Sequence, residues 1–304
     1  MKSLALSLLI ATAAPTGGAA SGSVGEGPAY VVGVEAWRTA REARMRAPDG
    51  WLSIIGLTWL HQGENRFGSA ADDDVVLPSV TPPHAGSFVL EGRVVRLEIP
   101  SGSPVTLNGK APASRVLRTD VSAAPDVLAV GAVSWQLIER GGRIGVRVSD
   151  RENPLRTNWL GTRWFAIDPV YRVVARLEPR SGEMVVPDAS GGKQTLKSPG
   201  TLTFSLAGKP QRLDPVLDGD DDGDQLVMFR DATSGHETYG GGRFVRARRQ
   251  PDGTFVLDFN RAYAPPCAFT PYATCPLPPA QNRLRVAIPA GERNLGEGSR
   301  NARR

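Results

Sequence analysis

The chain has 304 residues, of which 40% are hydrophobic and 22% are charged, and its formal net charge is +5. This composition excludes an intrinsically disordered chain, a collagen-like chain and a protein with many membrane spans. The 34 glycines and 25 prolines favour a β-rich fold, because both residues are costly inside helices and common in turns. Arginine is spread along the chain with a denser run at 246–249, and no recognition motif accompanies it, so we expect no nucleic-acid partner.

The first twenty residues have the three parts of a signal peptide. Lys2 supplies a positive charge, residues 3–11 form a short apolar core, and small residues between Ala13 and Ala20 suit cleavage. The core is too short to cross a bilayer, and no other stretch has the apolar length of a membrane span. We therefore predict a signal peptide over residues 1–20 and a periplasmic or secreted protein without a membrane span.

One helix is predicted after the cleavage region. Residues 21–33 are rich in glycine and are predicted to form a linker. Residues 34–48 then place Val34, Trp37 and Met45 near one helical face, and the proline and glycine at the end of this segment stop the helix.

Short apolar runs alternate with turn residues from residue 49 onward, which is typical of sandwiches and barrels. The predicted strands are 51–60, 74–77, 87–90, 94–99, 133–139, 143–148, 163–167, 171–178, 201–207, 225–230, 242–247, 254–259 and 283–288. A hairpin is predicted across residues 250–253. The fold class is therefore mostly β, with a β-sandwich at 49–148, a second β-rich domain at 149–293 and a disordered tail at 294–304.

Cys267 and Cys275 are separated by seven residues in a proline-rich segment. An oxidising compartment would pair them, and closing so short a loop contributes about 2.5 kcal/mol in the chain-entropy model. A zinc site is the alternative, but zinc needs four ligands and favours two to four residues between paired cysteines, and the chain has only three histidines. The interpretation we favour is a disulfide, with no metal and no cofactor.

An acidic run at 218–224 places aspartates at positions 1, 3, 5 and 7 of a calcium-binding loop. Its twelfth position is Phe229 rather than a bidentate glutamate, and an apparent strand follows instead of a helix. A solvated acidic turn is the favoured interpretation, and calcium binding stays open. The chain also lacks a nucleophile elbow, a phosphate loop and a dinucleotide fingerprint.

A group of polar side chains lies around a glycine-rich turn in the second half of the chain. The candidate ligand-binding residues are Asp231, His236, Arg243, Asp258, Asn260 and Tyr263. The predicted hairpin would bring Arg243 opposite about residue 260, so that Arg243, Asp258 and Asn260 share one pocket. A guanidinium beside a carboxylate can hold an anionic or sugar ligand, and a neighbouring histidine can act as a general base. A buried Arg–Asp network would use the same residue types and stays open.

Five segments form long and specific motifs, at residues 49–60, 63–69, 229–235, 238–244 and 258–269. They resemble the uncharacterised bacterial and archaeal family called domain of unknown function 1684, and the resemblance extends over about residues 35–293. The family pattern has asparagine where this chain has Ala264, so any role of that amide is absent here. The family has no assigned activity, and the resemblance implies none.

The motifs at 67–69, 74–78 and 81–86 follow the order seen in forkhead-associated domains. That resemblance implies a β-sandwich, and in those domains the end loops read phosphothreonine. Ser69 and Thr81 stand where that pattern has the arginine and serine that carry the phosphate, so the strongest charge-assisted contact is missing. The resemblance therefore implies the fold without the ligand, and His84 is expected to organise its loop.

Two functional hypotheses follow. The first is an exported, non-catalytic ligand-binding or interaction protein, whose partner is a small molecule, a glycan or a protein. The second is a hydrolase-like enzyme that uses the neighbourhood of Arg243, Asp258 and His236. The absence of catalytic motifs favours the first hypothesis.

Overall fold

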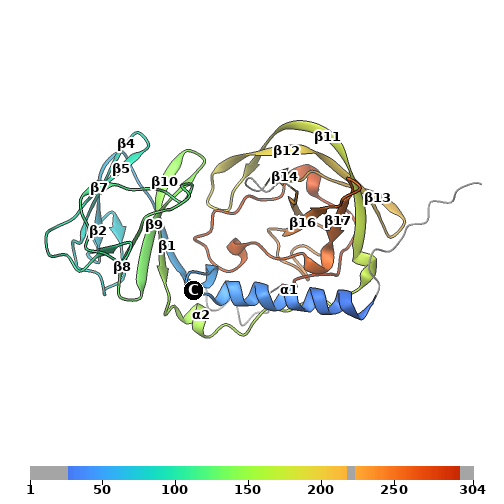
Figure 1. Cartoon of the computed structure of the whole chain (residues 1–304), viewed down its shortest axis with the longest axis horizontal. Coiled ribbons are helices and arrows are strands. Elements are labelled where there is room, and N and C mark those ends of the chain that lie inside the picture. Colours follow the sequence, from blue (N-terminus) through green and yellow to red (C-terminus); the bar gives the residue numbers. More distant parts are fainter. Residues whose placement is uncertain (1–26, 218–222, 295–304) are drawn as a thin grey trace, which may run out of the picture.

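The structure of the chain is a computed structural model that describes residues 27–217 and 223–294. It has two β-rich lobes, and a long helix runs along the larger one (Figure 1). The predicted signal peptide at 1–20, the first part of the predicted linker and nearly all of the predicted tail lie outside the described residues. The mostly β content confirms the predicted fold class. Within the described ranges, the helices lack the combined length and apolar character that a bilayer-spanning segment needs.

The long helix is α1 (Pro28–Arg46), so the predicted linker at 21–33 is wrong from Pro28 onward. Proline is favourable in the first turn of a helix, because the N–H that it lacks would have no helical partner there. The Tyr30 hydroxyl donates to Asp258 Oδ1 at 2.8 Å and anchors this first turn against the larger lobe. Val34 and Met45 are buried, as the predicted apolar face requires.

The smaller lobe is a β-sandwich, as predicted for residues 49–148. A short 3₁₀ turn, η1 (Trp51–Ser53), leads into it. Its strands are β1 (Ile54–Trp59), β2 (Gly63–Gly68), β3 (Val75–Val76), β4 (Gly86–Glu91), β5 (Val94–Glu98), β6 (Thr106–Leu107), β7 (Arg115–Val116), β8 (Val127–Val130), β9 (Val133–Arg140) and β10 (Arg143–Asp150). They form two five-stranded sheets, β1-β10-β9-β8-β6 and β3-β2-β4-β5-β7. Both sheets contribute to one core, in which Phe67 from the second sheet contacts Trp135 from the first.

The segment between the lobes contains α2 (Pro154–Thr157) and η2 (Pro169–Tyr171). The predicted strand at 163–167 is wrong, because this segment makes only an isolated bridge from Trp164 to Glu292. The Trp164 indole Nε1 donates to Glu42 Oε1 of α1 at 3.1 Å. The segment therefore packs against the helix instead of joining a sheet.

The larger lobe contains one seven-stranded sheet, in the order β13-β12-β11-β17-β16-β15-β14. Its strands are β11 (Arg172–Pro187), β12 (Lys193–Leu206), β13 (Lys209–Leu213), β14 (Val216–Leu217), β15 (Gln225–Phe229), β16 (Arg243–Arg249) and β17 (Phe255–Asp258). Only Asp214 and Pro215 separate the two edge strands β13 and β14, so the sheet curls back on itself. Three 3₁₀ turns follow, η3 (Phe259–Arg261), η4 (Pro266–Ala268) and η5 (Ala280–Asn282).

Alternation along β16 separates two apolar clusters on opposite faces of this sheet. Val245 and Ala247 face the inner cluster, which residues from β11, β12, β13, β15 and β17 also line. Phe244 faces the outer cluster together with Leu226 of β15. The predicted strand at 283–288 is wrong, since this segment makes only an isolated bridge, but its apolar side chains fill the inner cluster.

The β11–β12 hairpin bends sharply, and its distal arm (residues 182–198) covers the outer face of the sheet. The register shifts between Pro179 and Gly182, which is the signature of a bulge. Gly200 lies opposite the bend with φ +150°, and a Cβ there would lie 2.1 Å from the Glu178 carbonyl oxygen. Beyond the bend, Met184 and Leu196 pack on the outer cluster. The bend therefore makes one wall of the cavity described below.

The predicted hairpin across 250–253 is confirmed, since Arg249 of β16 pairs with Phe255 of β17. The register pairs Ala247 with Leu257, which places Arg248 and Val256 on the opposite face. The predicted acidic turn at 218–224 falls largely outside the described residues, between β14 and β15.

Candidate functional site

A cavity of about 990 Å³ lies between α1, the outer face of the seven-stranded sheet and the distal arm of the β11–β12 hairpin. Its lining comes from distant parts of the chain: α1, strands β11, β12 and β14–β17, the 261–276 segment, and Arg140 at the tip of the sandwich. A volume of this size suits a small-molecule ligand. The cavity is therefore the candidate site, at a place where both lobes and the helix meet.

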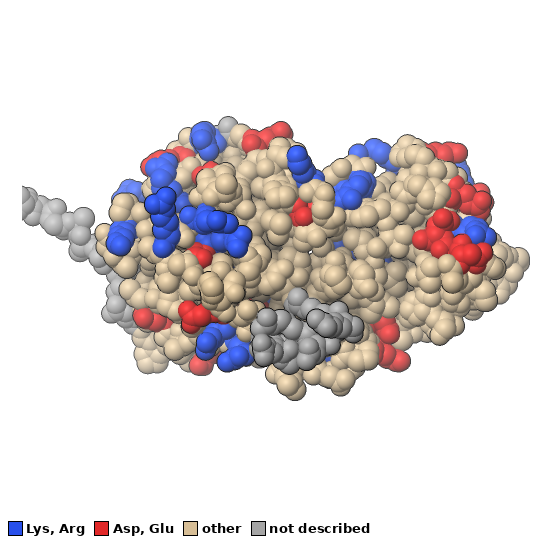
Figure 2. All heavy atoms as spheres, turned by 180° about the vertical axis from the view of Figure 1, so that it is seen from behind, with Lys and Arg blue, Asp and Glu red and all other residues tan. Residues whose placement is uncertain are grey.

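Arginine dominates the charged groups of the cavity wall. Seven arginines and two aspartates line it: Arg41, Arg44, Arg140, Arg172, Arg246, Arg248, Arg261, Asp49 and Asp258. Seen from behind, the lobe at the left of Figure 2 carries most of the Lys and Arg patches, whereas an acidic patch marks the other lobe. Arginine therefore outnumbers aspartate among the lining residues, although Arg41, Arg140 and Arg248 also have carboxylate partners behind the wall.

The guanidiniums differ in their partners, and Arg172 lies over the Tyr30 ring at 5.4 Å from its centroid. Arg140 pairs with Asp120 of the sandwich at 2.7 Å, and Arg261 Nε lies 3.3 Å from Asp258 Oδ2. Within the described residues, Arg172 has no carboxylate oxygen within 4.0 Å, and its buried Nη1 has no hydrogen-bond acceptor. A buried guanidinium N–H without an acceptor is costly, so a ligand oxygen there would be favourable.

Arg172, Arg248 and Arg261 form a cluster of like charge at one end of the cavity. Burial lowers the pKa of Arg261, and the positive charges of Arg248 and Arg172 lower it further, while Asp258 opposes the change. We call these three residues the arginine cluster. Asp258 lies beside Arg261, and Asp224 Oδ2 lies 4.0 Å from Arg248 Nε, so two carboxylates stand against three guanidiniums and a smaller positive excess is left at this end of the cavity.

Tyr30 and Asn260 hold Asp258 beside the arginine cluster. The Tyr30 hydroxyl donates to Asp258 Oδ1 at 2.8 Å and accepts from Asn260 Nδ2 at 2.9 Å. Asn260 Nδ2 also donates to the Asp168 carbonyl at 2.8 Å, and its Oδ1 accepts from the Asp168 N–H at 3.0 Å. Burial and the Asp258 charge raise the pKa of Tyr30, so the phenol keeps its proton. Asn260 therefore positions the loop and Tyr30, and Asp258 is the group that faces the cavity.

A buried ion pair fixes the middle of α1 to the larger lobe. Arg41 Nη2 lies 3.0 Å from Glu292 Oε2 and donates to the Ala264 carbonyl at 2.7 Å. The guanidinium also lies 4.4 Å from the ring centroid of Tyr263, which lines the cavity. Burial raises the pKa of Glu292, and the Arg41 charge opposes that change. Arg41 thus lines the cavity and also takes part in a buried ion pair.

The structure separates Arg243 and its partner Asp231 from Asp258, Asn260 and Tyr263. Arg243 Nη2 lies 2.8 Å from Asp231 Oδ2 and donates to the Ile288 carbonyl at 2.9 Å, and Nη1 donates to the Ala290 carbonyl. Its side chain is 1% exposed and that of Asp231 is 0% exposed. Arg243 points to the inner face of the sheet because it is out of phase with Arg246 and Arg248, whereas Asp258 lines the cavity on the outer face.

His236 lies on the exposed side of the turn that Asp231 organises, and it does not line the cavity. Asp231 Oδ1 accepts from the Thr233 hydroxyl at 2.6 Å and from the Thr233 backbone N–H at 3.1 Å. The carboxylate therefore stabilises the turn. Of the six predicted site residues, the structure brings together Asp258, Asn260 and Tyr263 near the cavity, and it holds Asp231 and Arg243 in a buried pair elsewhere.

Cys267 and Cys275 are not joined by a disulfide in the structure, so the predicted bond is not shown. They are nevertheless neighbours, because the Cys267 N–H donates to Cys275 Sγ at 3.4 Å. Burial of Cys275 and its contact with Cys267 raise the pKa of the Cys275 thiol. Cys275 also lines the cavity.

None of the three residues of the arginine cluster is among the predicted site residues. The run at 246–249 carries no recognition motif, but arginine at every second position of a strand places both side chains on one face. Phe244, Arg246 and Arg248 do line the cavity together. Arg172 and Arg261 carry no such local signal, because only the packing of β11 and η3 beside β16 brings them there.

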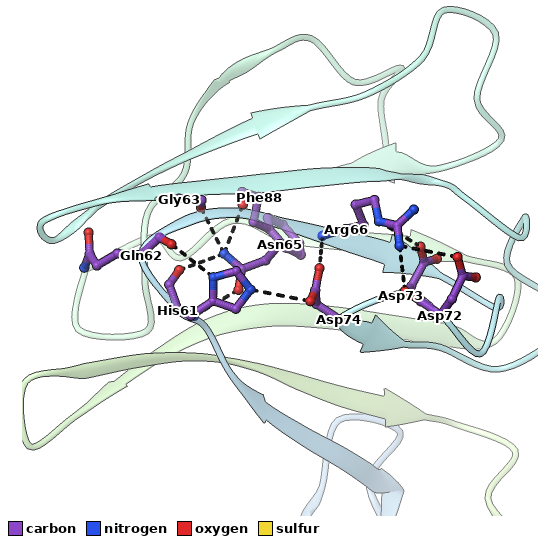
Figure 3. A network of polar contacts seen from close by, with 9 residues as sticks. All are labelled: His61, Gln62, Gly63, Asn65, Arg66, Asp72, Asp73, Asp74 and Phe88. Atoms are coloured by element: carbon purple, nitrogen blue, oxygen red, sulfur yellow. Dashed lines mark hydrogen bonds and ion pairs between the residues drawn. The ribbon is translucent and has the colours of Figure 1, made fainter.

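An acidic group in the sandwich is the second place where ligand atoms gather. Asp72, Asp73 and His84 offer ligand atoms within 4.8 Å of one another. Arg66 already supplies positive charge to this loop, since its Nη2 lies 3.4 Å from Asp72 and its Nε 4.0 Å from Asp73 (Figure 3). His84 Nδ1 lies 3.0 Å from Asp73 Oδ1, consistent with the expected role of His84 in organising the loop.

The fold and the cavity define a two-lobed β protein with an arginine-lined cleft beneath a helix. Residues 157–293 match the model of the family described as protein of unknown function, DUF1684. The chain belongs to this family, as the motifs of its second half predict. The matched residues include β11–β17 and the arginine cluster, whereas the motifs at 49–60 and 63–69 lie outside them.

Several solved structures are similar to parts of the chain. One is an uncharacterised protein from Haloarcula marismortui, with 35% identity and a TM-score of 0.38, over 47% of this chain and 80% of that one. A second comes from a study of phosphothreonine-dependent FHA domain interactions, with 18% identity and a TM-score of 0.22, over 31% of this chain and 92% of that one. A third is an FHA domain complexed with an intracellular domain of another protein, with 18% identity and a TM-score of 0.21, over 30% of this chain and 96% of that one. No curated protein is significantly similar to the chain.

Proposed function

We propose that this protein is a non-catalytic binding protein that holds an anionic small molecule in the cavity beneath α1. The observation that supports this proposal is the charge of the wall, where seven arginines stand against two aspartates. Guanidinium groups bind carboxylates and phosphates through paired N–H donors, which makes arginine well suited to an anionic ligand.

The arginine cluster gives the proposal its physical basis. Bringing Arg172, Arg248 and Arg261 together costs free energy through burial and mutual repulsion, which both lower the pKa of Arg261. Asp258 and Asp224 together compensate only part of this charge. An anion that enters the cluster would remove the remaining repulsion and would accept from the buried Arg172 Nη1.

Binding fits the geometry better than hydrolysis does. The hydrolase hypothesis requires Arg243, Asp258 and His236 around one reacting group. Arg243 is buried on the inner face of the sheet, and neither it nor His236 lines the cavity that Asp258 faces. The catalytic arrangement that this hypothesis needs is therefore not assembled, and a glycan or a protein partner remains an outcome to be tested.

Export is part of the proposal. The features of residues 1–20 favour cleavage between Ala13 and Ala20 and a periplasmic or secreted location, where Cys267 and Cys275 would form a disulfide. Expression of the full chain and mass measurement of the mature protein tests this part. A retained Met1 in the fractionated protein would contradict export.

Titration with inorganic sulfate and phosphate tests the binding proposal. Binding is expected to quench the fluorescence of Trp37 and Trp51, which line the cavity, and to raise the thermal midpoint. The double variant Arg248→Gln, Arg261→Gln is expected to weaken sulfate binding at least about tenfold, because each charge-assisted hydrogen bond contributes about 1.5–3 kcal/mol.

The matched control is Arg212→Gln, which removes an exposed arginine that pairs with Glu178 and does not line the cavity. Sulfate affinity in this variant is expected to match that of the unmodified protein. Equal losses of sulfate affinity in the control and the double variant would show that only the net charge of the protein matters, which would contradict a specific site. No binding of either anion up to millimolar concentrations would reject the proposed function.

A further inference from the structure

We infer that the ligand of this cavity is an amphiphilic anion, in which one anionic head group binds the arginine cluster and an apolar chain or ring lies along the outer apolar cluster of the sheet. This inference rests on the proposed function and narrows it to a class of ligand. It is carried by the way in which charged and apolar side chains are divided along the cavity.

The separation of charged from apolar side chains is clearest along β16. Phe244, Arg246 and Arg248 alternate with inward-facing residues and line the cavity in that order. Two residues of a strand advance by about 6.7 Å, so Phe244 and Arg248 are separated by about 13 Å. The strand therefore places an apolar wall at one end of the cavity and the guanidinium of the arginine cluster at the other.

The apolar wall is continuous across several strands. Leu196 of the distal arm, Val216 of β14, Leu226 of β15 and Phe244 of β16 belong to one cluster and all line the cavity. Trp51 packs against the same cluster from the sandwich side. An apolar surface that lines a cavity gains free energy when a ligand removes it from water, which an inorganic anion in the arginine cluster would not do.

The length of the cavity fits an extended ligand. Tyr30 and Met45 of α1 both line it, and the helix rises by about 22 Å between them. Tyr30 marks the end beside Asp258 and the arginine cluster, where its hydroxyl donates to that carboxylate. Met45 marks the end near Trp51, where Arg44 and Asp49, which carry opposite charges, also line the cavity. A ligand anchored by its head at the Tyr30 end can therefore run along the helix over the apolar wall.

The geometry favours a free, monomeric amphiphile as the ligand. The wall is enclosed by α1 on one side and the distal arm on the other, so an isolated chain fits between them. Burial of one methylene raises affinity by about fourfold, so decanoate is expected to bind at least about tenfold more tightly than acetate.

The test uses the full mature protein and isothermal titration calorimetry with four probes: acetate, decanoate, decanol and decyltrimethylammonium. Decanoate is expected to bind most tightly, with acetate at least about tenfold weaker and with decanol and decyltrimethylammonium also weaker than decanoate. Arg248→Gln with Arg261→Gln is expected to abolish the preference for decanoate over decanol. Leu226→Asn is expected to reduce decanoate affinity at least about fivefold while sulfate affinity stays unchanged. Arg212→Gln serves again as the control that changes neither.

The outcomes separate the inference from the proposed function. Equal affinity for acetate and decanoate, or for decanoate and decanol, would overturn the inference, while sulfate binding that depends on the arginine cluster would leave the proposed function standing. The failure of every anion to bind would overturn both. Sedimentation with phosphatidylglycerol vesicles in the absence of decanoate binding would identify a membrane surface as the partner and would overturn the inference.

Discussion

Replacement of Arg243 by alanine tests whether this residue is structural. The Arg243 and Asp231 side chains are 1% and 0% exposed, and their guanidinium and carboxylate groups approach to 2.8 Å. The same guanidinium donates to the Ile288 and Ala290 carbonyls, and Asp231 Oδ2 also accepts from the Ile288 N–H at 3.0 Å. The substitution would leave a buried carboxylate without its counter-charge and would remove the Arg243 donor from both carbonyls, of which the Ile288 carbonyl keeps the Ala290 N–H as a donor at 2.8 Å.

Breaking a buried ion pair on one side costs about 3–5 kcal/mol, because the remaining charge is uncompensated. Each kcal/mol lowers the thermal midpoint of a domain of this size by about 2–4 °C, so the expected drop is about 6–20 °C. Urea unfolding at 25 °C measures the free energy directly. The exposed pair of Arg212 with Glu178 provides the contrast, and Arg212→Ala is expected to cost less than about 1 kcal/mol.

A double variant sharpens this test. Arg243→Met combined with Asp231→Leu removes both charges, and it is expected to cost less than the sum of the two single changes. Because Arg243 does not line the cavity, sulfate affinity of the folded Arg243→Ala protein is expected to stay within about twofold. A stability loss below about 1 kcal/mol, or a tenfold loss of affinity in folded protein, would refute the reasoning.

Three further predictions follow from other buried polar groups. Asn260→Ala removes hydrogen bonds to Asp168 and Tyr30 and is expected to cost about 2–3 kcal/mol in urea unfolding; an unchanged midpoint would show that other contacts hold this loop. The Arg118 guanidinium holds the pKa of Asp126 well below its usual range, so the stability this carboxylate contributes is present above about pH 4 and is lost as the pH falls further. Asp126→Asn is therefore expected to cost about 1–2 kcal/mol at pH 7 and less at pH 2, and an equal deficit at both pH values would contradict this. Finally, protein isolated from an oxidising compartment is expected to show no reactive thiol before reduction, whereas two reactive thiols would reject the disulfide.

Local patterns determined the elements that depend on neighbouring residues. The hairpin at 250–253 was predictable because turn residues and the two apolar runs that they join lie within a few positions of one another. The start of α1 was missed, since Gly33 and the preceding glycines resemble a linker and the tertiary contact of Tyr30 with Asp258 stabilises the first turn. Runs of apolar residues at 163–167 and 283–288 resemble strands, but each segment makes only an isolated bridge, because the first packs against α1 and the second fills the inner cluster.

The candidate site shows the same division between local and tertiary information. Asp258 and Tyr263 were identified from the density of polar residues, and both line the cavity. Arg243 was placed on the wrong face because the predicted register did not specify which side of β16 faces the core. A shift of one residue exchanges the two faces of a strand, so composition alone could not decide between them.

The sequence by itself determined that this chain is mostly β, that a sandwich precedes a second sheet, and that its motifs match an uncharacterised family. Only the tertiary structure decided where the charge gathers. Arg44 and Arg248 line one cavity although about two hundred residues separate them, because the curled sheet and the bent β11–β12 hairpin bring α1 and β16 together. Such long-range packing depends on the whole set of contacts in the folded chain, and no local pattern in the sequence encodes it.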